Sequence, residues 1–413
     1  MKNRSDIAHL RENRDININE VISDNESYNY FYDSVSVFFR VISFLIFGLL
    51  LVFVVSSAFL SAESFSYDNL DYIMRNFALT LEENRDTSRQ PIRYNPDLNR
   101  SFSLFGEGLV VCGSTNINIF SPTGRQTCSE YHSYTTPVMK SSDKYTLVYD
   151  ENSSGYSLYN YFSEVYCGEC VKNIRAAYVA DNGFYALITS SDEYNSVVEV
   201  YNDQFDIISR YNKNGYAVMA DLNSDELMIV SVSSNKLMDK FDIEIIVSDI
   251  GAESAKHKIN IQSGFPLSCQ ITDFGYAVVC SNNVYLFDKY GDLIGEYSFS
   301  TAELNSFAIS DSHVFLLFEN SGFEINYNAV CIDKNAKILY NWSADETIFD
   351  IELFGSSAFI LTDNSVIKIN ENGSNVIETD AGDYECKLLA LNTKLIYLCS
   401  VTSAKLLDFS DNN

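Results

Sequence analysis

The residues of this chain best suited to chemistry are its nine cysteines, because a thiolate can act as a nucleophile or as a metal ligand. Cys167 and Cys170 form a C-x-x-C pair, a spacing found in thiol redox centres and in one half of many zinc sites. A redox centre needs a helix N-terminus to lower the thiol pKa, whereas this pair is expected at the end of a strand. Zinc needs a second ligand pair, and the three histidines beyond residue 60 are scattered. We therefore predict a structural disulfide or two plain thiols.

Two further cysteine pairs are placed symmetrically about turn-like steps. Cys269 and Cys280 are equidistant from the bond between residues 274 and 275, and Cys386 and Cys399 from the bond between residues 392 and 393. Directly opposed residues of a hairpin lie about 4.5–5.5 Å apart at Cα, which suits a disulfide. Each pair is predicted to bridge a hairpin, the alternative being buried thiols that pack as small apolar groups. An odd number leaves at least one unpaired cysteine, which we assign to Cys331.

Other chemical signatures are absent or incomplete. Residues 221–225 resemble the start of a calcium loop, but Glu226 stands where the loop needs glycine and Val232 where it needs glutamate, so a surface turn is predicted. The sequence contains no phosphate-binding glycine loop, no nucleophile elbow and no zinc-binding H-E-x-x-H. A net charge of −28, from 56 acidic and 28 basic residues, disfavours nucleic acid. We expect no catalytic activity, no cofactor and no metal.

The elements that carry these residues repeat from residue 100 onward. In segments 108–125 and 275–299 an apolar pair precedes an Asp, Asn or Ser that opens a turn, with glycine three residues later. The turn-opening position recurs eight times at a mean step of 41 residues: Ser121, Asn160, Asn202, Ser248, Asp288, Asp333, Asn370 and Asp408. A period of about 40–45 residues with short strands is typical of β-propeller blades.

The repeat predicts an all-β, eight-bladed propeller over residues 91–413. A seven-bladed propeller is the alternative, with Asn160 or Ser248 wrongly counted, and a pair of β-sandwiches fits the constant period less well. Asp408 lies five residues from the end of the sequence, too close for a full outer strand. Residues 90–96 are therefore expected to supply the missing strand of the last blade.

The N-terminal part predicts a membrane anchor. Residues 41–60 are uncharged and long enough to span a bilayer as a helix. Forty residues precede this run, so a signal anchor is favoured over a cleaved signal peptide, and the lack of a polar face argues against a core helix. Basic residues before the run, and cysteines only beyond it, favour an internal N-terminus. The predicted order is a cytoplasmic tail (1–40), a transmembrane helix (41–60), a stalk helix and linker (61–90, with the helix at 70–85) and an extracytoplasmic propeller.

This layout resembles that of an uncharacterised family of single-pass, membrane-anchored β-propeller proteins of Gram-positive anaerobic bacteria. Segments 120–124 (FSPTG) and 287–291 (FDKYG) are also similar to blade turns of quinoprotein-like and WD-like propellers. The repeated tryptophan of the quinoproteins is absent, since Trp342 is the only tryptophan. The resemblance therefore implies the fold, and no quinone or metal ligand is carried over from it.

Two functions follow as expectations. The first is a non-enzymatic scaffold of the cell envelope that binds one or more envelope proteins. The second is a sensor that binds a glycan or a peptide through tyrosine-rich loops near the axis, such as those around Tyr156, Tyr159, Tyr161 and Tyr166. A deep central pocket with convergent polar groups would favour the sensor, and a flat apolar patch would favour the scaffold.

Overall fold

The computed structural model describes most of the second part of the chain and little of the first. The described residues are 35–51, 75, 91–95, 100–234, 240–252, 254–299, 303–319, 326–371, 373, 376–381 and 385–410. The chain divides into two units, residues 1–80 and residues 81–413.

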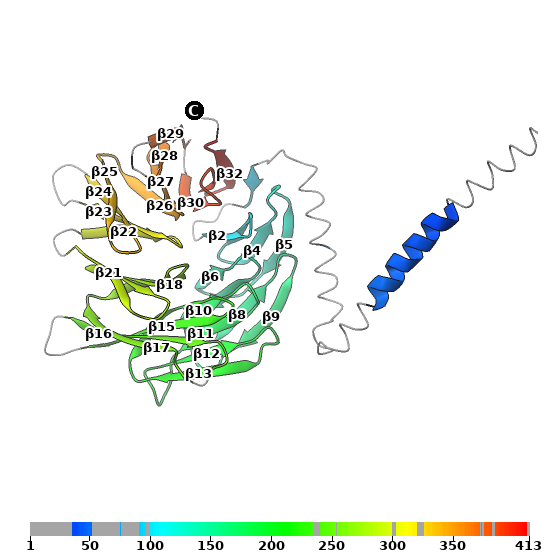
Figure 1. Cartoon of the computed structure of the whole chain (residues 1–413), viewed down its shortest axis with the longest axis horizontal. Coiled ribbons are helices and arrows are strands. Elements are labelled where there is room, and N and C mark those ends of the chain that lie inside the picture. The colour runs from blue at the N-terminus through cyan, green and yellow to red at the C-terminus, as the bar shows by residue number, and fades with distance from the viewer. Residues whose placement is uncertain are drawn as a thin grey trace, which may run out of the picture. The chain divides into compact units, whose positions relative to one another are not determined.

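The described element of the first unit is a helix over residues 35–51, drawn in blue in Figure 1. It contains the first part of the predicted span, and residues 52–60 lie outside the described residues. Its apolar side chains are largely exposed, with Phe44 at 80% and Leu49 at 66%. Within the described ranges, no helix is both long and apolar enough to cross a membrane. Of the predicted stalk helix only Arg75 is described, and it is helical.

The second unit is built from eight four-stranded antiparallel sheets, which surround an axis as the blades of a propeller (Figure 1). The predicted eight-bladed fold is confirmed, and the seven-bladed alternative is wrong. The inner strands of successive blades lie next to one another in the pairs β2–β6, β6–β10, β10–β14, β14–β18, β22–β26 and β26–β30, and β30 lies next to β2. This last contact closes the ring.

Each blade is ordered from its inner to its outer strand, and blades 1–7 are continuous in sequence. Blade 1 contains β2 (Ser101–Phe105), β3 (Gly108–Cys112), β4 (Asn116–Phe120) and β5 (Gln126–Tyr131), and blade 2 contains β6 (Pro137–Ser141), β7 (Thr146–Asp150), β8 (Gly155–Tyr159) and β9 (Glu164–Glu169). Blade 3 contains β10 (Ile174–Val179), β11 (Tyr185–Thr189), β12 (Ser196–Tyr201) and β13 (Ile207–Lys213), and blade 4 contains β14 (Tyr216–Leu222), β15 (Glu226–Ser234), β16 (Phe241–Asp249) and β17 (His257–Ser263). Blade 5 contains β18 (Pro266–Thr272), β19 (Gly275–Cys280), β20 (Asn283–Asp288) and β21 (Leu293–Ser298). Blade 6 contains β22 (Glu303–Ile309), β23 (His313–Glu319), β24 (Tyr327–Asp333) and β25 (Ile338–Ala344), and blade 7 contains β26 (Ile348–Phe354), β27 (Ser357–Thr362), β28 (Ser365–Ile369) and β29 (Val376–Asp380).

Blade 8 takes strands from both ends of the propeller. Its inner three strands are β30 (Glu385–Ala390), β31 (Leu395–Ser400) and β32 (Ser403–Asp408), and its outer strand is β1 (Ile92–Arg93). β1 runs antiparallel to β32, with Ile92 opposite Ala404 and Arg93 opposite Ser403. The backbone amide of Tyr94 extends the pairing by donating to the carbonyl of Thr402 at 3.1 Å. The predicted donor segment therefore completes the last blade.

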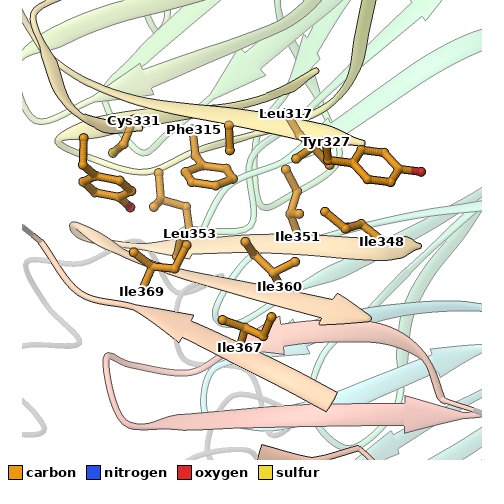
Figure 2. Close-up of a cluster of buried hydrophobic side chains, with 13 residues drawn as sticks. Phe315, Leu317, Tyr327, Cys331, Ile348, Ile351, Leu353, Ile360, Ile367 and Ile369 are labelled. Carbon is orange, nitrogen blue, oxygen red and sulfur yellow. The ribbon is translucent and has the colours of Figure 1, made fainter. Parts of the chain in front are cut away.

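The core lies between the blades. The middle strands are covered on both faces, and accordingly β3 (GLVVC) and β19 (GYAVVC) are buried at every position. Outer strands have one exposed face, and β17 accordingly alternates between polar and apolar residues. Among the described residues, eight hydrophobic clusters form, one at each interface between neighbouring blades. Figure 2 shows the cluster between blades 6 and 7, where Phe315 and Leu317 face Ile351 and Ile360.

Candidate functional site

The inner strands line the central channel, and six consecutive ones carry a β-bulge at the same place. In β10, β14, β18, β22, β26 and β30 the pairing to the second strand skips one residue, which is the second or third of the strand. A bulge re-aims a side chain and is frequent beside functional sites. We call the six extra residues the bulge ring: Arg175, Val218, Leu267, Asn305, Phe349 and Cys386.

The bulge ring brings apolar side chains to the surface at one end of the inner strands. Phe349 is 55% exposed and Leu267 is 42% exposed. Phe265 and Tyr216, which lie at the beginnings of the inner strands of blades 5 and 4, are 40% and 48% exposed. Large apolar side chains that remain in water at equivalent positions of several blades are typical of a contact surface.

Further along the inner strands of blades 2–5 the channel contains a pocket of about 430 Å³. Asp221 of β14 lies in its wall, and burial raises the pKa of this carboxyl. Lys140 of β6 lies with its ammonium 5.6 Å from the ring centre of Tyr178 of β10. Burial holds the pKa of the Cys269 thiol well above its ordinary value, so this group stays protonated.

Two aspartates of inner strands accept hydrogen bonds from backbone amides of the inner strand in the next blade. The backbone amide of Ile271 donates to Asp221 Oδ2 at 2.6 Å, and the amide of Leu388 donates to Asp350 Oδ2 at 2.7 Å. Sequence reasoning missed both roles, since it placed Asp221 in a surface turn. The turn begins two residues later, where the amides of residues 225 and 226 donate to Asn223 Oδ1.

The inner strands of blades 7 and 8 carry three charged side chains that contact one another. Lys387 Nζ lies 2.9 Å from Asp350 Oδ1 and 3.5 Å from Glu352 Oε1. Burial raises the pKa of Glu352 to about 7, although the Lys387 ammonium acts in the opposite direction. Glu352 can therefore exchange a proton near neutral pH, but no activated nucleophile accompanies it in the described part of the channel.

The described residues contain no cluster of three or more side chains suited to hold a metal ion. The pair most similar to a thiol nucleophile and its base is Cys112 with His132, whose Sγ and Nε2 atoms lie 3.9 Å apart. His132 Nε2 also lies 3.1 Å from the carbonyl oxygen of Gly113, which requires that this nitrogen carry the proton. A nitrogen that donates to a carbonyl cannot accept the thiol proton, and Cys112 is 1% exposed. This pair is therefore structural.

The two predicted hairpin bridges need correction, because the nine cysteines, each within the described residues, form no disulfide. The first hairpin of blade 5 turns over two residues, with Thr272 opposite Gly275, so Cys269 faces Val278 and Cys280 faces Pro266. The predicted turn was centred one residue too late. In blade 8 the bulge shifts the register, so Lys387 faces Cys399, and Cys386 is the extra residue.

The C-x-x-C pair lies at the end of an outer strand, as expected. Cys167 belongs to β9 and faces Ser157, and Cys170 follows the strand. Burial raises the pKa of the Cys170 thiol to about 12, so a reactive thiolate is disfavoured there. Cys331 is a fully buried thiol of β24.

The eight turn-opening positions are spread over the eight blades. Seven of them close a third strand or follow it directly: Ser121, Asn160, Asn202, Asp288, Asp333, Asn370 and Asp408. Ser248 is the exception, because it lies inside β16, and the turn begins one residue later, where the amide of Ala252 donates to the carbonyl of Asp249 at 3.1 Å. Of the four tyrosines near residue 160, Tyr156 and Tyr159 are core residues at most 3% exposed, and the other two are half-buried.

Comparisons with known proteins agree with the fold. A family model described as "Family of unknown function (DUF5711)" matches residues 87–403. No curated protein sequence matches the chain. BamB of Moraxella catarrhalis is 12% identical with a TM-score of 0.52, and the match covers 78% of this chain and 99% of that one. The computationally designed protein Ika8 is 8% identical with a TM-score of 0.59, covering 78% and 100%. Sqt1 of Saccharomyces cerevisiae is 8% identical with a TM-score of 0.56, covering 78% and 99%. Identities this low show a shared fold alone.

Proposed function

We propose that this chain, which belongs to the family of unknown function DUF5711, is an interaction scaffold of the cell envelope without catalytic activity of its own. The propeller is placed outside the cytoplasm, and the N-terminal segment anchors it in the membrane. The partner is an envelope protein that presents an apolar patch bordered by basic residues.

The bulge ring carries this proposal. Each of six consecutive inner strands contains one extra, unpaired residue near the same end. Leu267 and Phe349 are the large, exposed apolar residues among these six. Exposed apolar groups do not stabilise a monomer, whereas a partner that covers them gains about 25 cal/mol of binding free energy per Å² of apolar surface removed from water. The net charge of −28 favours a basic rim on that partner, because opposite charge speeds encounter and excludes acidic competitors.

The anchor rests on the uncharged run of residues 41–60. Its described part, residues 41–51, is helical, and large apolar side chains of this part, such as Phe44, are exposed. Hydrocarbon would cover these side chains, and Arg40 at the start of the run suits the headgroup region.

The scaffold is tested by affinity capture with the detergent-solubilised full-length protein. The variant Leu267→Asp/Phe349→Asp places two charges in the bulge ring. Its control is Leu293→Asp/Ile338→Asp, which changes two side chains of similar exposure, 52% and 44%, at the first residues of outer strands. An envelope protein retained by the native chain and the control at about 0.1 and 0.5 M salt, but lost by the bulge-ring variant, is the expected result. Equal retention by both variants would refute the bulge ring as the contact surface.

The location is tested by thiol labelling. Among the nine cysteines Cys167 and Cys386 are the exposed ones. A membrane-impermeant maleimide is expected to label the native chain in intact cells and to lose most of this signal in Cys167→Ser/Cys386→Ser. A cysteine introduced in that background as Ser5→Cys should react only after lysis. Labelling of residue 5 in intact cells would show the opposite orientation.

A ligand-binding sensor is the second candidate, and the channel pocket favours it. A volume of about 430 Å³ suits a small molecule, and Asp221, Lys140 and Tyr178 supply polar groups from three blades. The same capture experiment separates the two functions, because a sensor retains no protein through the bulge ring.

A further inference from the structure

Blade 4 differs from the other blades in length. Its two middle strands, β15 and β16, contain nine residues each, whereas the middle strands of the other seven blades contain five to seven. Most of the added length lies toward the hairpin that joins them. The neighbouring blade 3 has middle strands of five and six residues, so the extended part of blade 4 has less opposite it.

The two faces of blade 4 are chemically different in this extended part. Val230, Val232, Ile243 and Ile245 point to one side and pack against blade 5. The other side carries two rows across three strands, in which Ser231, Glu244 and Asn260 are opposed, and then Ser233, Asp242 and Gln262. Ser231 is buried, but Ser233, Asn260 and Gln262 are exposed, so this side of the extended part is not packed as core although blades normally bury both faces against each other.

This polar face forms one wall of a groove of about 900 Å³. The end of β13 in blade 3 and the two residues that follow it form the opposite wall. Of the seventeen residues that line the groove, twelve have side chains that donate or accept hydrogen bonds. We call this space the interblade groove, and it shares no residue with the channel pocket.

A buried ion pair fixes the floor of the interblade groove. Lys213 is 6% exposed, and its ammonium contacts Glu244 Oε2. Lys258 Nζ lies 2.6 Å from Glu244 Oε1. Burial raises the pKa of Glu244, but the two lysines outweigh this effect and hold it below its ordinary value. Glu244 is therefore favoured in its ionised form as an acceptor held by two lysines, and its single negative charge offsets one of the two lysine charges beside it.

The rim adds groups that both donate and accept. Asn212, Asn260 and Gln262 are exposed, and Gln262 Nε2 donates to Asp242 Oδ1 at 2.7 Å. Tyr211 adds an aromatic ring to the wall. Over the whole lining three basic residues stand against two acidic ones, so neither a strongly anionic nor a strongly cationic ligand is matched.

We propose that the interblade groove binds a carbohydrate chain that is neutral or N-acetylated. Sugar hydroxyls donate and accept at once, which matches amide side chains and a fixed carboxylate flanked by ammonium groups. An apolar ligand would leave these groups without hydrogen-bond partners and would therefore be disfavoured. This binding is independent of the scaffold function and involves neither the bulge ring nor its partner.

The test uses the full-length protein in a detergent without a sugar headgroup, titrated by calorimetry with a panel of neutral and N-acetylated oligosaccharides from disaccharides to hexasaccharides. At least one member of the panel should bind saturably. Asn260→Ala/Gln262→Ala should weaken that binding about fivefold to a hundredfold, since it removes two hydrogen-bonding side chains worth about 0.5–1.5 kcal/mol each. Both side chains are exposed, so thermal unfolding should be unchanged.

Two control variants make the result specific. Asn328→Ala/Asn341→Ala removes two exposed amides from blade 6 and should leave sugar binding intact. Leu267→Asp/Phe349→Asp should also leave it intact, which separates this site from the scaffold surface. The proposal is overturned if no oligosaccharide of the panel binds, if only polyanions or peptides bind, or if the groove variant binds as tightly as the native chain.

Discussion

The completion of blade 8 by β1 makes the side chain of Ile92 important for the stability of the propeller. Ile92 is 3% exposed and packs between blades 8 and 1 against Leu109, Phe120 and Tyr397. Replacing a buried isoleucine by alanine costs about 2–5 kcal/mol, because the lost carbons leave a cavity. We therefore expect Ile92→Ala to lower the free energy of unfolding by that amount.

The expected change in melting temperature follows from the size of the domain. Unfolding entropy is about 2.1 cal/mol/K per residue, or roughly 0.7 kcal/mol/K for a domain of about 320 residues. Ile92→Ala should thus lower the melting temperature by about 3–7 °C. The measurement is thermal unfolding of the full-length chain in detergent, followed by circular dichroism at the β-sheet band.

Arg93 provides the matched control, because it is the other residue of β1 and its side chain is exposed. Arg93→Ala preserves the backbone pairing, and a surface substitution of this kind should change stability by no more than about 0.5 kcal/mol. If Ile92→Ala melts at the same temperature as Arg93→Ala, β1 does not close the ring in solution.

Two further predictions concern the channel and a turn. Burial raises the pKa of Glu352 to about 7, so its protonated form favours the fold, and this stabilisation is lost as pH rises from the ordinary value of 4.5 through about 7. Glu352→Gln should therefore melt at a higher temperature than the native chain at about pH 8, and the two melting temperatures should differ less at about pH 4. The exposed control Glu130→Gln should melt at the same temperature as the native chain at both pH values. If Glu352→Gln melts like the native chain at both pH values, the raised pKa of Glu352 is refuted. Gly275→Ala should destabilise the propeller strongly, since a Cβ there would meet the Phe287 carbonyl oxygen at 2.3 Å. Gly251→Ala should cost only about 1 kcal/mol, because its Cβ enters open space and only the positive φ of 78° opposes it. Similar chemical-denaturation midpoints for the two variants would contradict this reasoning.

The large features of the fold were predictable because they depend on periodic patterns. The spacing from Ser121 to Asp408 reports the blade repeat, and the short remainder after Asp408 indicated that another segment must complete the ring. Both inferences need only the positions of turns, which Asp, Asn, Ser and Gly mark through local backbone chemistry.

The candidate site was harder to predict because it depends on single-residue changes of register. Leu267 and Cys386 are bulge residues, and a bulge leaves no signature in an apolar strand. One inserted residue places Cys386 outside the pairing and brings Lys387 opposite Cys399, which removes the predicted bridge. The aspartate ties across blades were invisible for another reason: Asp221 and Ile271 are fifty positions apart, and nothing local marks their contact. The interblade groove was not predicted at all, although the alternating K-I-N-I-Q of residues 258–262 is typical of a strand with one polar face.

The join between β1 and β32 also gives the molecule a mechanical weak point at a defined place. Everything that precedes residue 91 in the chain connects to the propeller through a strand of two residues, held by the pairs Ile92–Ala404 and Arg93–Ser403. Tension applied along the chain from the N-terminal side therefore loads this short ladder before any other strand. Under pulling force the ring should yield at this seam first and expose one edge of β32, which another β-strand can then pair with while the opposite edge stays paired with β31. A tethered propeller of this design would thus respond to force by opening one blade while the other seven stay folded.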